Sequence, residues 1–416
     1  MIEQLPDRLD RNACAELDAA DSLARFRDRF LVDDAVVYLD GNSMGRLPRA
    51  TVERLERMAE HEWGRILVRA WTEYGWMESP MRVGDSVAEL IGAEQGEVLI
   101  AESTSVNLFK LIVSVLRARP GRRVVITERT NFPTDLYITS GATELLGCEL
   151  RAVERAGIAE ALDTDTALLT LTHVDYRTGE RHDMGALTEA AHRAGALVLW
   201  DLSHSVGAVE IDLHRDGVDL AVGCGYKYLN GGPGAPAFLY VAAGLQRELA
   251  NPIQGWLGHA TPFTFEPEYR RAEGIRRWMS GSPSVLAIAA LEVGVGIHLE
   301  AGARPVADKA ALLTEVFMRL ARARLSPLGF EVVTPDDPGR RGAQVSLRHD
   351  DGLAIVRAVT DRGVIADFRP PDLCRFGLAP LYTRFVDLWD AVERLAEVVE
   401  TGMNRLPQYR EEVAIP

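Results

Sequence analysis

Six short apolar runs, separated by polar turns and helical patterns, occupy the middle of the sequence and decide what it can fold into. They are rich in Val, Leu and Ile and lack polar alternation, which is typical of strands buried on both faces of a sheet. The runs are residues 97–103, 122–128, 167–174, 196–204, 218–224 and 237–241. Between the first two, residues 106–118 repeat apolar side chains at helical spacing. This alternation predicts an α/β fold with a mostly parallel sheet flanked by helices.

The pattern changes near residue 290, where longer helical stretches replace the alternation. These stretches surround short strand-like runs such as FEVVTP and AQVSLRH, which predicts helices on a short antiparallel sheet. A chain of 416 residues is long enough for one large and one smaller domain. We therefore expect residues 1–50 to pack with the small domain, residues 51–290 to form the large domain, and residues 291–416 to form the small α+β domain. The small domain would then be built from both chain ends.

Composition and charge exclude several classes of function. The chain has 46 basic and 61 acidic side chains and a net charge of −15, which disfavours binding to nucleic acids and anionic membranes. No apolar run approaches the length of a membrane span, and residues 1–23 lack the apolar core of a signal peptide. The cysteines show neither a C-x-x-C pair nor metal-ligand spacing; they are Cys14, Cys148, Cys224 and Cys374. We expect a cytoplasmic protein with reduced thiols, no metal ion, and no nucleic-acid or membrane partner.

Polar and aromatic residues follow the predicted strands at the points where the strands end. In parallel sheets, ligands bind outside these carboxyl ends. Each residue alone has an ordinary explanation as a helix cap or a core side chain. The candidates are Thr104 and Ser105, Phe132 and Asp135, Asp175 and Tyr176, Asp201 and His204, and Tyr226 and Lys227.

Taken together, these residues supply what the cofactor pyridoxal 5'-phosphate requires. Lys227 can form the Schiff base, and Asp201 can keep the pyridine nitrogen protonated so that the ring accepts electrons. Hydroxyls and free N–H groups at a helix start, as at Thr104 and Ser105, can bind the phosphate. An aromatic ring such as Phe132 can stack on the cofactor. Because Asp201 and Lys227 follow strands that we expect to be neighbours, both can reach one ring.

Several motifs resemble kynureninases, which are fold-type I pyridoxal-phosphate enzymes of the aspartate aminotransferase superfamily. DLSHSVG and GYKYLNGGPG mark the wider class, whereas STSVN, NFPTD, GWLGH, SGSPSVL and RFGLAPLY are more specific. The likeness extends from residue 38 to residue 382, which is nearly the whole chain. It implies hydrolytic cleavage of the Cβ–Cγ bond of L-kynurenine to anthranilate and L-alanine. That reaction belongs to tryptophan catabolism through the kynurenine pathway, which also serves NAD biosynthesis.

The resemblance also implies a role for individual residues. The catalytic residues would be Lys227, Tyr226 as the proton donor, and Asp201. The cofactor would be bound by Thr104, Ser105, Phe132, Pro133, Thr134, Asp135, Thr172, Asp201, His204, Tyr226, Lys227, Trp256 and Ser282. The substrate would be bound by Ser43, His61 and Arg375. Arg375 would hold the α-carboxylate through bidentate hydrogen bonds. Trp256 and Ser282 would act from the partner subunit, which implies a homodimer with shared active sites.

Other activities of the same fold remain open at this point. A cysteine desulfurase needs a mobile reactive cysteine and an R-x-S sequence at the carboxylate-binding arginine, but Cys374 directly precedes Arg375 and no serine follows in that place. An aminotransferase or an epimerase would use the same lysine. A catalytically inactive scaffold is disfavoured because the lysine, the aspartate and the arginine are all present.

Overall fold

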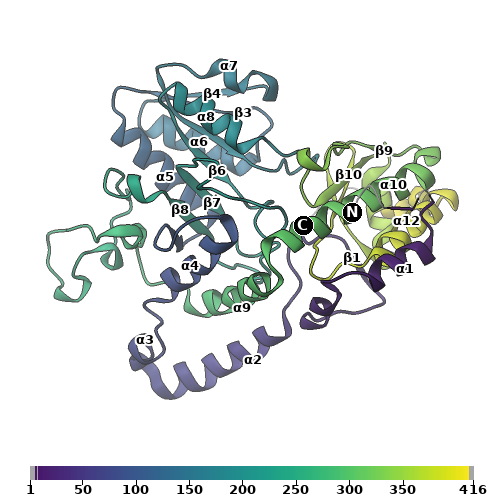
Figure 1. Cartoon of the computed structure of the whole chain (residues 1–416), viewed down its shortest axis with the longest axis horizontal. Coiled ribbons are helices and arrows are strands. Elements are labelled where there is room, and N and C mark those ends of the chain that lie inside the picture. The colour runs from purple at the N-terminus through teal and green to yellow at the C-terminus, as the bar shows by residue number, and fades with distance from the viewer. Residues whose placement is uncertain (1–4, 7, 412–416) are drawn as a thin grey trace.

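A seven-stranded sheet forms the centre of the large domain (Figure 1). The computed structural model describes residues 5–6 and 8–411. The strand order is β2-β8-β7-β6-β5-β3-β4, and only β8 runs antiparallel to its neighbours, so the other strands end at the same edge. The strands are β2 (Val98–Ile100), β3 (Val124–Glu128), β4 (Glu149–Val153), β5 (Thr166–Thr172), β6 (Leu197–Asp201), β7 (Leu220–Gly223) and β8 (Phe238–Val241). The predicted mostly parallel sheet is confirmed.

Helices cover both faces of this sheet. Successive residues of the central strands β6 and β7 point to opposite faces, where they enter two separate apolar cores. One core contains α4 (Ser79–Ile91), α7 (Ile158–Ala161), α8 (Met184–Arg193) and α9 (Val285–Ala301), and the other contains α5 (Thr104–Ala118) and α6 (Pro133–Leu145). This burial on both faces explains why the strands read as continuous apolar runs. The edge strand β4 is half exposed and mixes charged with apolar residues, so its pattern was not recognised as a strand.

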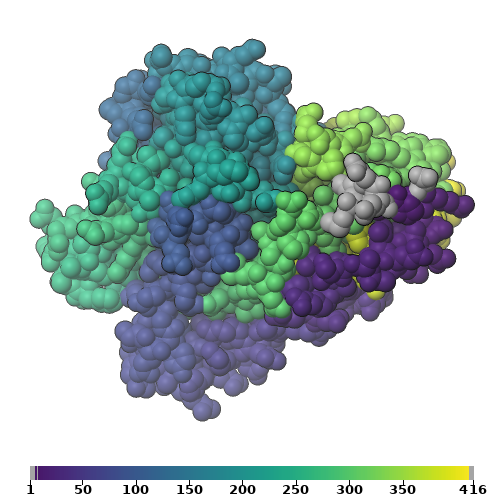
Figure 2. All heavy atoms as spheres, viewed as in Figure 1, coloured from purple at the N-terminus to yellow at the C-terminus, as the bar shows by residue number. Residues whose placement is uncertain are grey.

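The small domain is built from both ends of the chain, as predicted. Its antiparallel sheet has the order β12-β13-β10-β9, and β1 (Val37–Tyr38) pairs in parallel with β11 (Val364–Ile365). The remaining strands are β9 (Glu331–Val332), β10 (Gln344–Arg348), β12 (Asp367–Arg369) and β13 (Leu373–Gly377). The helices are α1 (Arg11–Ala19), α10 (Ala303–Arg324), α11 (Gly352–Asp361), α12 (Phe385–Glu400) and α13 (Pro407–Arg410). Figure 2 shows the N-terminal segment lying against the C-terminal part of the chain.

Two projections stand out from the body of the molecule (Figures 1 and 2). The first runs from α2 (Arg49–Arg57) through the π-helix η3 (Met58–Ile66) and the short turn η4 (Leu67–Arg69) to α3 (Ala70–Glu73). The second is formed by residues 256–272, which include the 3-10 turns η7 (Trp256–Gly258) and η8 (Pro262–Thr264). Large apolar side chains on these projections face solvent in the single chain, namely Trp63, Leu67, Val68, Trp256, Phe263 and Phe265.

Across the described ranges, no single helix has the length and apolarity needed to cross a membrane; α9 and α10 reach them only as a pair that is bent by 85°.

Candidate active site

A cavity at the carboxyl edge of the large sheet collects residues that follow five different strands. It is lined by Thr104, Ser105, Phe132, Thr134, Asp135, Thr172, Tyr176, Asp201, Ser203, His204, Tyr226 and Lys227. The expected cofactor-binding residues that do not line it are Pro133, Trp256 and Ser282. Pro133 opens α6 between Phe132 and Thr134, where its fixed φ suits the first turn of a helix.

Lys227 enters the cavity on the loop after β7, the neighbour of β6, which ends at Asp201. Its Nζ lies 5.8 Å from the ring centre of Phe132 and 5.9 Å from that of Tyr226. The N-terminal segment fixes this loop, because the Gly45 amide donates to the Tyr226 carbonyl oxygen at 2.8 Å. A Cβ at Gly45 would collide with the Lys227 carbonyl oxygen, so only glycine allows this approach.

The lysine content of the chain identifies the same residue by elimination. The sequence contains only three lysines, although it has 46 basic residues. Lys110 is fully buried and its Nζ pairs with Glu102 at 3.0 Å, while Lys309 pairs with Asp21 at 2.7 Å. Buried, paired lysines serve structural roles, so Lys227 is the lysine that remains as a candidate nucleophile. This count was a signal in the sequence that motif reasoning did not use.

Asp201 forms a hydrogen-bonded carboxyl pair with Asp135 in the same cavity as Lys227. Both are buried, and burial raises the pKa of each. The pKa of Asp135 rises further because of the negative charge on Asp201, whereas hydrogen bonds from Ser203 and the charge of Lys227 oppose the rise at Asp201. The Ser203 amide donates to Asp201 Oδ1 at 2.7 Å. Asp135 therefore holds the proton and donates to Asp201, which keeps its negative charge.

The cavity also offers hydrogen-bond donors for an anion. Ser103 caps α5, its Oγ accepting from the Val106 amide at 3.3 Å, and this places Thr104 and Ser105 in the first turn. His204 is buried, and burial together with the charge of Lys227 lowers the pKa of its ring well below the ordinary value. Its Nδ1 finds no hydrogen-bond partner among the described residues. A buried unpaired nitrogen beside a helix N-terminus fits a phosphate-bearing cofactor held here.

The proposed substrate residues lie in two places. Ser43 and Arg375 meet, with Arg375 Nη2 donating to Ser43 Oγ at 2.9 Å. Arg375 Nη1 donates to the Tyr176 carbonyl oxygen at 2.8 Å, and the Tyr176 ring lies 5.1 Å from that of Phe132, so Tyr176 connects this group to the cofactor cavity. His61 lies on the first projection, where its Nε2 is 2.9 Å from the Tyr74 hydroxyl.

Sequence reasoning missed three residues of the site. Ser203 and Tyr176 line the cavity, and Tyr176 was noted at a strand end without a role. Asp367 was not considered, yet it occupies the two-pronged edge of the Arg375 guanidinium: Nε donates to Asp367 Oδ1 at 2.7 Å, and Nη2 donates to Asp367 Oδ2. Its only signal was a place in a strand-like run, which does not distinguish it from an ordinary surface acid.

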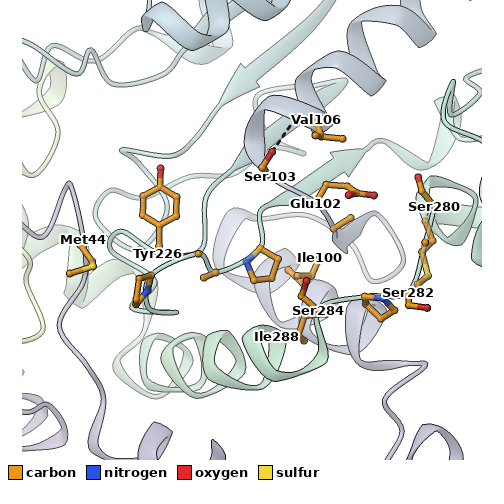
Figure 3. Close-up of a pocket in the computed structure, with 18 of the residues that line it drawn as sticks. Met44, Ile100, Glu102, Ser103, Val106, Tyr226, Ser280, Ser282, Ser284 and Ile288 are labelled. Atoms are coloured by element: carbon orange, nitrogen blue, oxygen red, sulfur yellow. Dashed lines mark hydrogen bonds between the residues drawn. The ribbon is translucent and has the colours of Figure 1, made fainter. Parts of the chain in front are cut away.

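A second hollow of about 680 Å³ adjoins the cavity at Tyr226 (Figure 3). Met44 and Tyr226 lie on one side of it, and Ser280 and Ser282 on the other. Ser43 also lines it, so it lies next to both the lysine loop and the Arg375 group. The hollow has room for a substrate side chain beside the cofactor. Within the part of the chain that the structure describes, no group of three His, Cys, Asp or Glu side chains could hold a metal ion.

Comparisons with known proteins identify the family of the chain. The model of the kynureninase C-terminal domain matches residues 306–395. A kynureninase of Pseudomonas fluorescens is 44% identical over 397 residues, covering 94% of this chain and 95% of the relative. A kynureninase of Burkholderia pseudomallei (strain 1106a) is 43% identical over 412 residues, covering 97% of this chain and 99% of the relative.

Solved structures share the fold at low sequence identity. A cysteine desulfurase from Thermococcus onnurineus NA1 has a TM-score of 0.78 and 16% identity, covering 91% of this chain and 98% of that structure. A mutant of C-DES with glycine covalently linked to its PLP cofactor has a TM-score of 0.78 and 18% identity. The match covers 89% of this chain and 99% of that structure. The fold class is thus confirmed, and identity over nearly the full length of both relatives shows that the chain belongs to the kynureninase family.

Proposed function

We propose that this protein hydrolyses the Cβ–Cγ bond of L-kynurenine to give anthranilate and L-alanine, with pyridoxal 5'-phosphate as its cofactor. The 44% identity to a kynureninase over 94% of the chain carries the proposal. The cavity supports it, because one lysine, one charged aspartate, and donors at a helix N-terminus surround one small space. When bound, the cofactor supplies an electron sink that stabilises negative charge on the substrate Cα.

Residues of the cavity divide the binding of the cofactor between them. Lys227 would hold its aldehyde carbon, and Asp201 would keep the proton on its ring nitrogen because Asp135 leaves Asp201 charged. Phe132 would cover one face of the ring. The phosphate would accept hydrogen bonds at the wall made by Thr104, Ser105 and His204.

Two residues would move protons on the substrate. Lys227 Nζ would take the proton from the substrate Cα, since no other lysine lines the cavity. After water has added to the γ-carbonyl and the Cβ–Cγ bond has broken, Tyr226 would donate a proton to the alanyl carbon. Burial raises the pKa of the Tyr226 hydroxyl, so it holds its proton throughout the neutral range and can serve as the acid.

The buried thiols disfavour the desulfurase alternative. Cys374 is fully buried, and burial raises its pKa to about 12, while burial also raises the pKa of Cys224. A thiol must ionise to act as a nucleophile, so neither residue is suited to that role. All four cysteines are free, which supports the cytoplasm as the compartment of the protein; recovery of the protein outside the cytosolic fraction of its own cells would contradict this.

Purified protein supplied with pyridoxal phosphate is expected to convert L-kynurenine to equimolar anthranilate and alanine. Anthranilate fluorescence and an enzymatic alanine assay measure the two products. Parallel reactions with L-cysteine, and with L-alanine plus a 2-oxo acid, serve as controls. Sulfide from cysteine, or amino-group transfer with no anthranilate, would assign the protein to a different activity of this fold.

We further infer a homodimer whose active sites are shared. Trp256 is 41% exposed on the second projection, and neither Trp256 nor Ser282 lines the cofactor cavity of its own chain. Trp63 and Phe265 are 59% and 78% exposed, which is unusual for large apolar side chains unless a partner covers them. Both projections are therefore suited to reach the active site of a second copy.

Mixing two inactive variants tests this arrangement. In a hybrid of Lys227→Ala and Trp256→Ala subunits, Trp256 of the first would complete the site that contains Lys227 of the second. Co-refolding should then restore activity to about a quarter of the wild-type value, since half of the dimers are hybrids with one complete site each. Each variant refolded alone is the control. No recovery would mean that Trp256 serves its own chain, and a monomer in sedimentation would refute the dimer.

A further inference from the structure

The arginine assigned to the substrate carboxylate is already paired. Arg375 is 2% exposed, and the Nε and Nη2 edge of its guanidinium faces Asp367. In addition, Nη1 donates to the Tyr176 carbonyl oxygen and Nη2 to Ser43 Oγ, and the Ser43 hydroxyl donates in turn to Asp367 Oδ2 at 2.8 Å. The edge of the Arg375 guanidinium that best matches a carboxylate is therefore already occupied by the carboxylate of Asp367.

Asp367 has a second cation within reach. Arg369 Nη2 donates to Asp367 Oδ2 at 2.8 Å, so this carboxylate bridges two guanidinium groups. Asp367 and Arg375 are register partners across β12 and β13, and Arg369 lies at the other end of β12. Asp367 can therefore leave Arg375 and remain paired with Arg369, which avoids leaving a buried charge alone.

A second carboxyl group, Asp40, lies beside this cluster. Asp40 lies in the same segment as Ser43. Its backbone forms a β-bridge with Gly377 at the end of β13. Burial and repulsion from Asp367 raise the pKa of Asp40 to about 7, while Ser43, Arg375 and Arg369 oppose the rise. The other ionisable groups near the cluster include Tyr38 from its own segment, Tyr176 from the loop after β5, and Tyr228 from the loop after β7. His204, from the loop after β6, is also within electrostatic range of Arg375 and Arg369, and burial lowers its pKa well below the ordinary value. Burial raises the pKa of each tyrosine, so among these groups only Asp40 titrates near neutral pH.

We propose that the substrate carboxylate binds by exchange: it takes the place of Asp367 on Arg375, Asp367 stays with Arg369, and Asp40 takes up a proton. This rests on the proposed role of Arg375. Two guanidinium groups then face two carboxylates, because the third carboxyl group has become neutral. Above the pKa of Asp40 in the free protein, binding must draw a proton from solution, so affinity falls as pH rises. Below that pKa, Asp40 is already protonated and binding draws none.

Calorimetry of the holoenzyme can detect this proton. The probe is 4-(2-aminophenyl)-4-oxobutanoate, which keeps the substrate carboxylate and lacks the reacting amine; its methyl ester is the uncharged control. At pH 8, in buffers of different ionisation enthalpy, the acid should take up close to one proton per site and the ester none. Its dissociation constant should rise up to about tenfold per pH unit above pH 7. Tight binding of the acid without proton uptake would overturn the exchange.

Variants assign the proton and the exchange to residues. Asp40→Asn should abolish the uptake and make the affinity independent of pH, whereas Asp372→Asn, which removes an acid paired with Arg348 outside the cluster, should change neither. Asp367→Asn should bind the acid roughly tenfold more tightly at pH 8, because the competing carboxylate is gone. Weaker binding by Asp367→Asn would show that Asp367 only orients Arg375, and unchanged uptake in Asp40→Asn would refute its role.

The proposed role of Arg375 is separated from the exchange by one further variant. Arg375→Lys should bind acid and ester about equally, since an ammonium group cannot reproduce the two-pronged contact. A wild-type protein that binds neither compound would contradict the proposed function itself. Binding that depends on Arg375 but takes up no proton would contradict the exchange alone.

Discussion

Lys227→Ala is expected to yield a folded protein that cannot attach pyridoxal phosphate covalently and forms no measurable anthranilate. The variant loses both the attachment point and the base at the substrate Cα, so kcat should fall by more than about 10⁴-fold. Borohydride reduction of the wild-type holoenzyme, followed by peptide mapping, should place the label on the peptide that contains residue 227. Circular dichroism of the variant checks that its fold is intact.

Because the chain contains few lysines, the label can be assigned to one of them directly. Lys309→Arg keeps a cation beside Asp21 and should retain both label and activity, which makes it the matched control. Lys110 is engaged with Glu102 and the Trp278 carbonyl oxygen and does not line the cavity. A label on either of these lysines would refute the assignment of Lys227.

Asp201→Asn is expected to lower kcat by about 10³-fold or more while the protein still folds and binds the cofactor. An amide carries no negative charge, so it cannot keep the ring nitrogen of the cofactor protonated, and the electron sink is lost. Steady-state kinetics with L-kynurenine, together with the dissociation constant of the cofactor, separate this chemical effect from a loss of binding.

Asp135→Asn is the matched control for that change. Burial and the charge of Asp201 already keep Asp135 protonated. An amide at this position can still donate a hydrogen bond to Asp201 and leaves the charge of the pair unchanged, so kcat should fall by less than about tenfold. Equal losses in the two variants would mean that the negative charge is carried by Asp135 instead.

The main features of the fold and of the cofactor cavity could be predicted from the sequence because they follow from local patterns. Continuous apolar runs identify strands buried on both faces, and parallel strands bring the residues at their ends together. For that reason Thr104, Asp201 and Lys227 are expected at one edge of the sheet, and all three line one cavity. The roles of these residues remain predictions, as do the limits of the domains at residues 50 and 290.

Other features depend on contacts between distant segments and leave no local pattern. β13 was not predicted, because an arginine in the middle of LCRFG argues against burial unless its partner is known. That partner, Asp367, is identified only by the register of β12 against β13. Likewise, α2 gives way to a π-helix at Met58, a change that apolar spacing does not encode.

The pairing of β1 with β11 sets the order in which the two parts of the site can form as the chain leaves the ribosome. Every strand of the large sheet has been synthesised by Val241, so the lysine loop and its surroundings can assemble early. Val37 and Tyr38 must wait for Val364 and Ile365, and Ser43 must wait for Arg375, which is 332 residues later. A nascent chain therefore acquires its cofactor pocket long before it can hold a substrate carboxylate, and Val37 and Tyr38 remain without their sheet partner for most of translation.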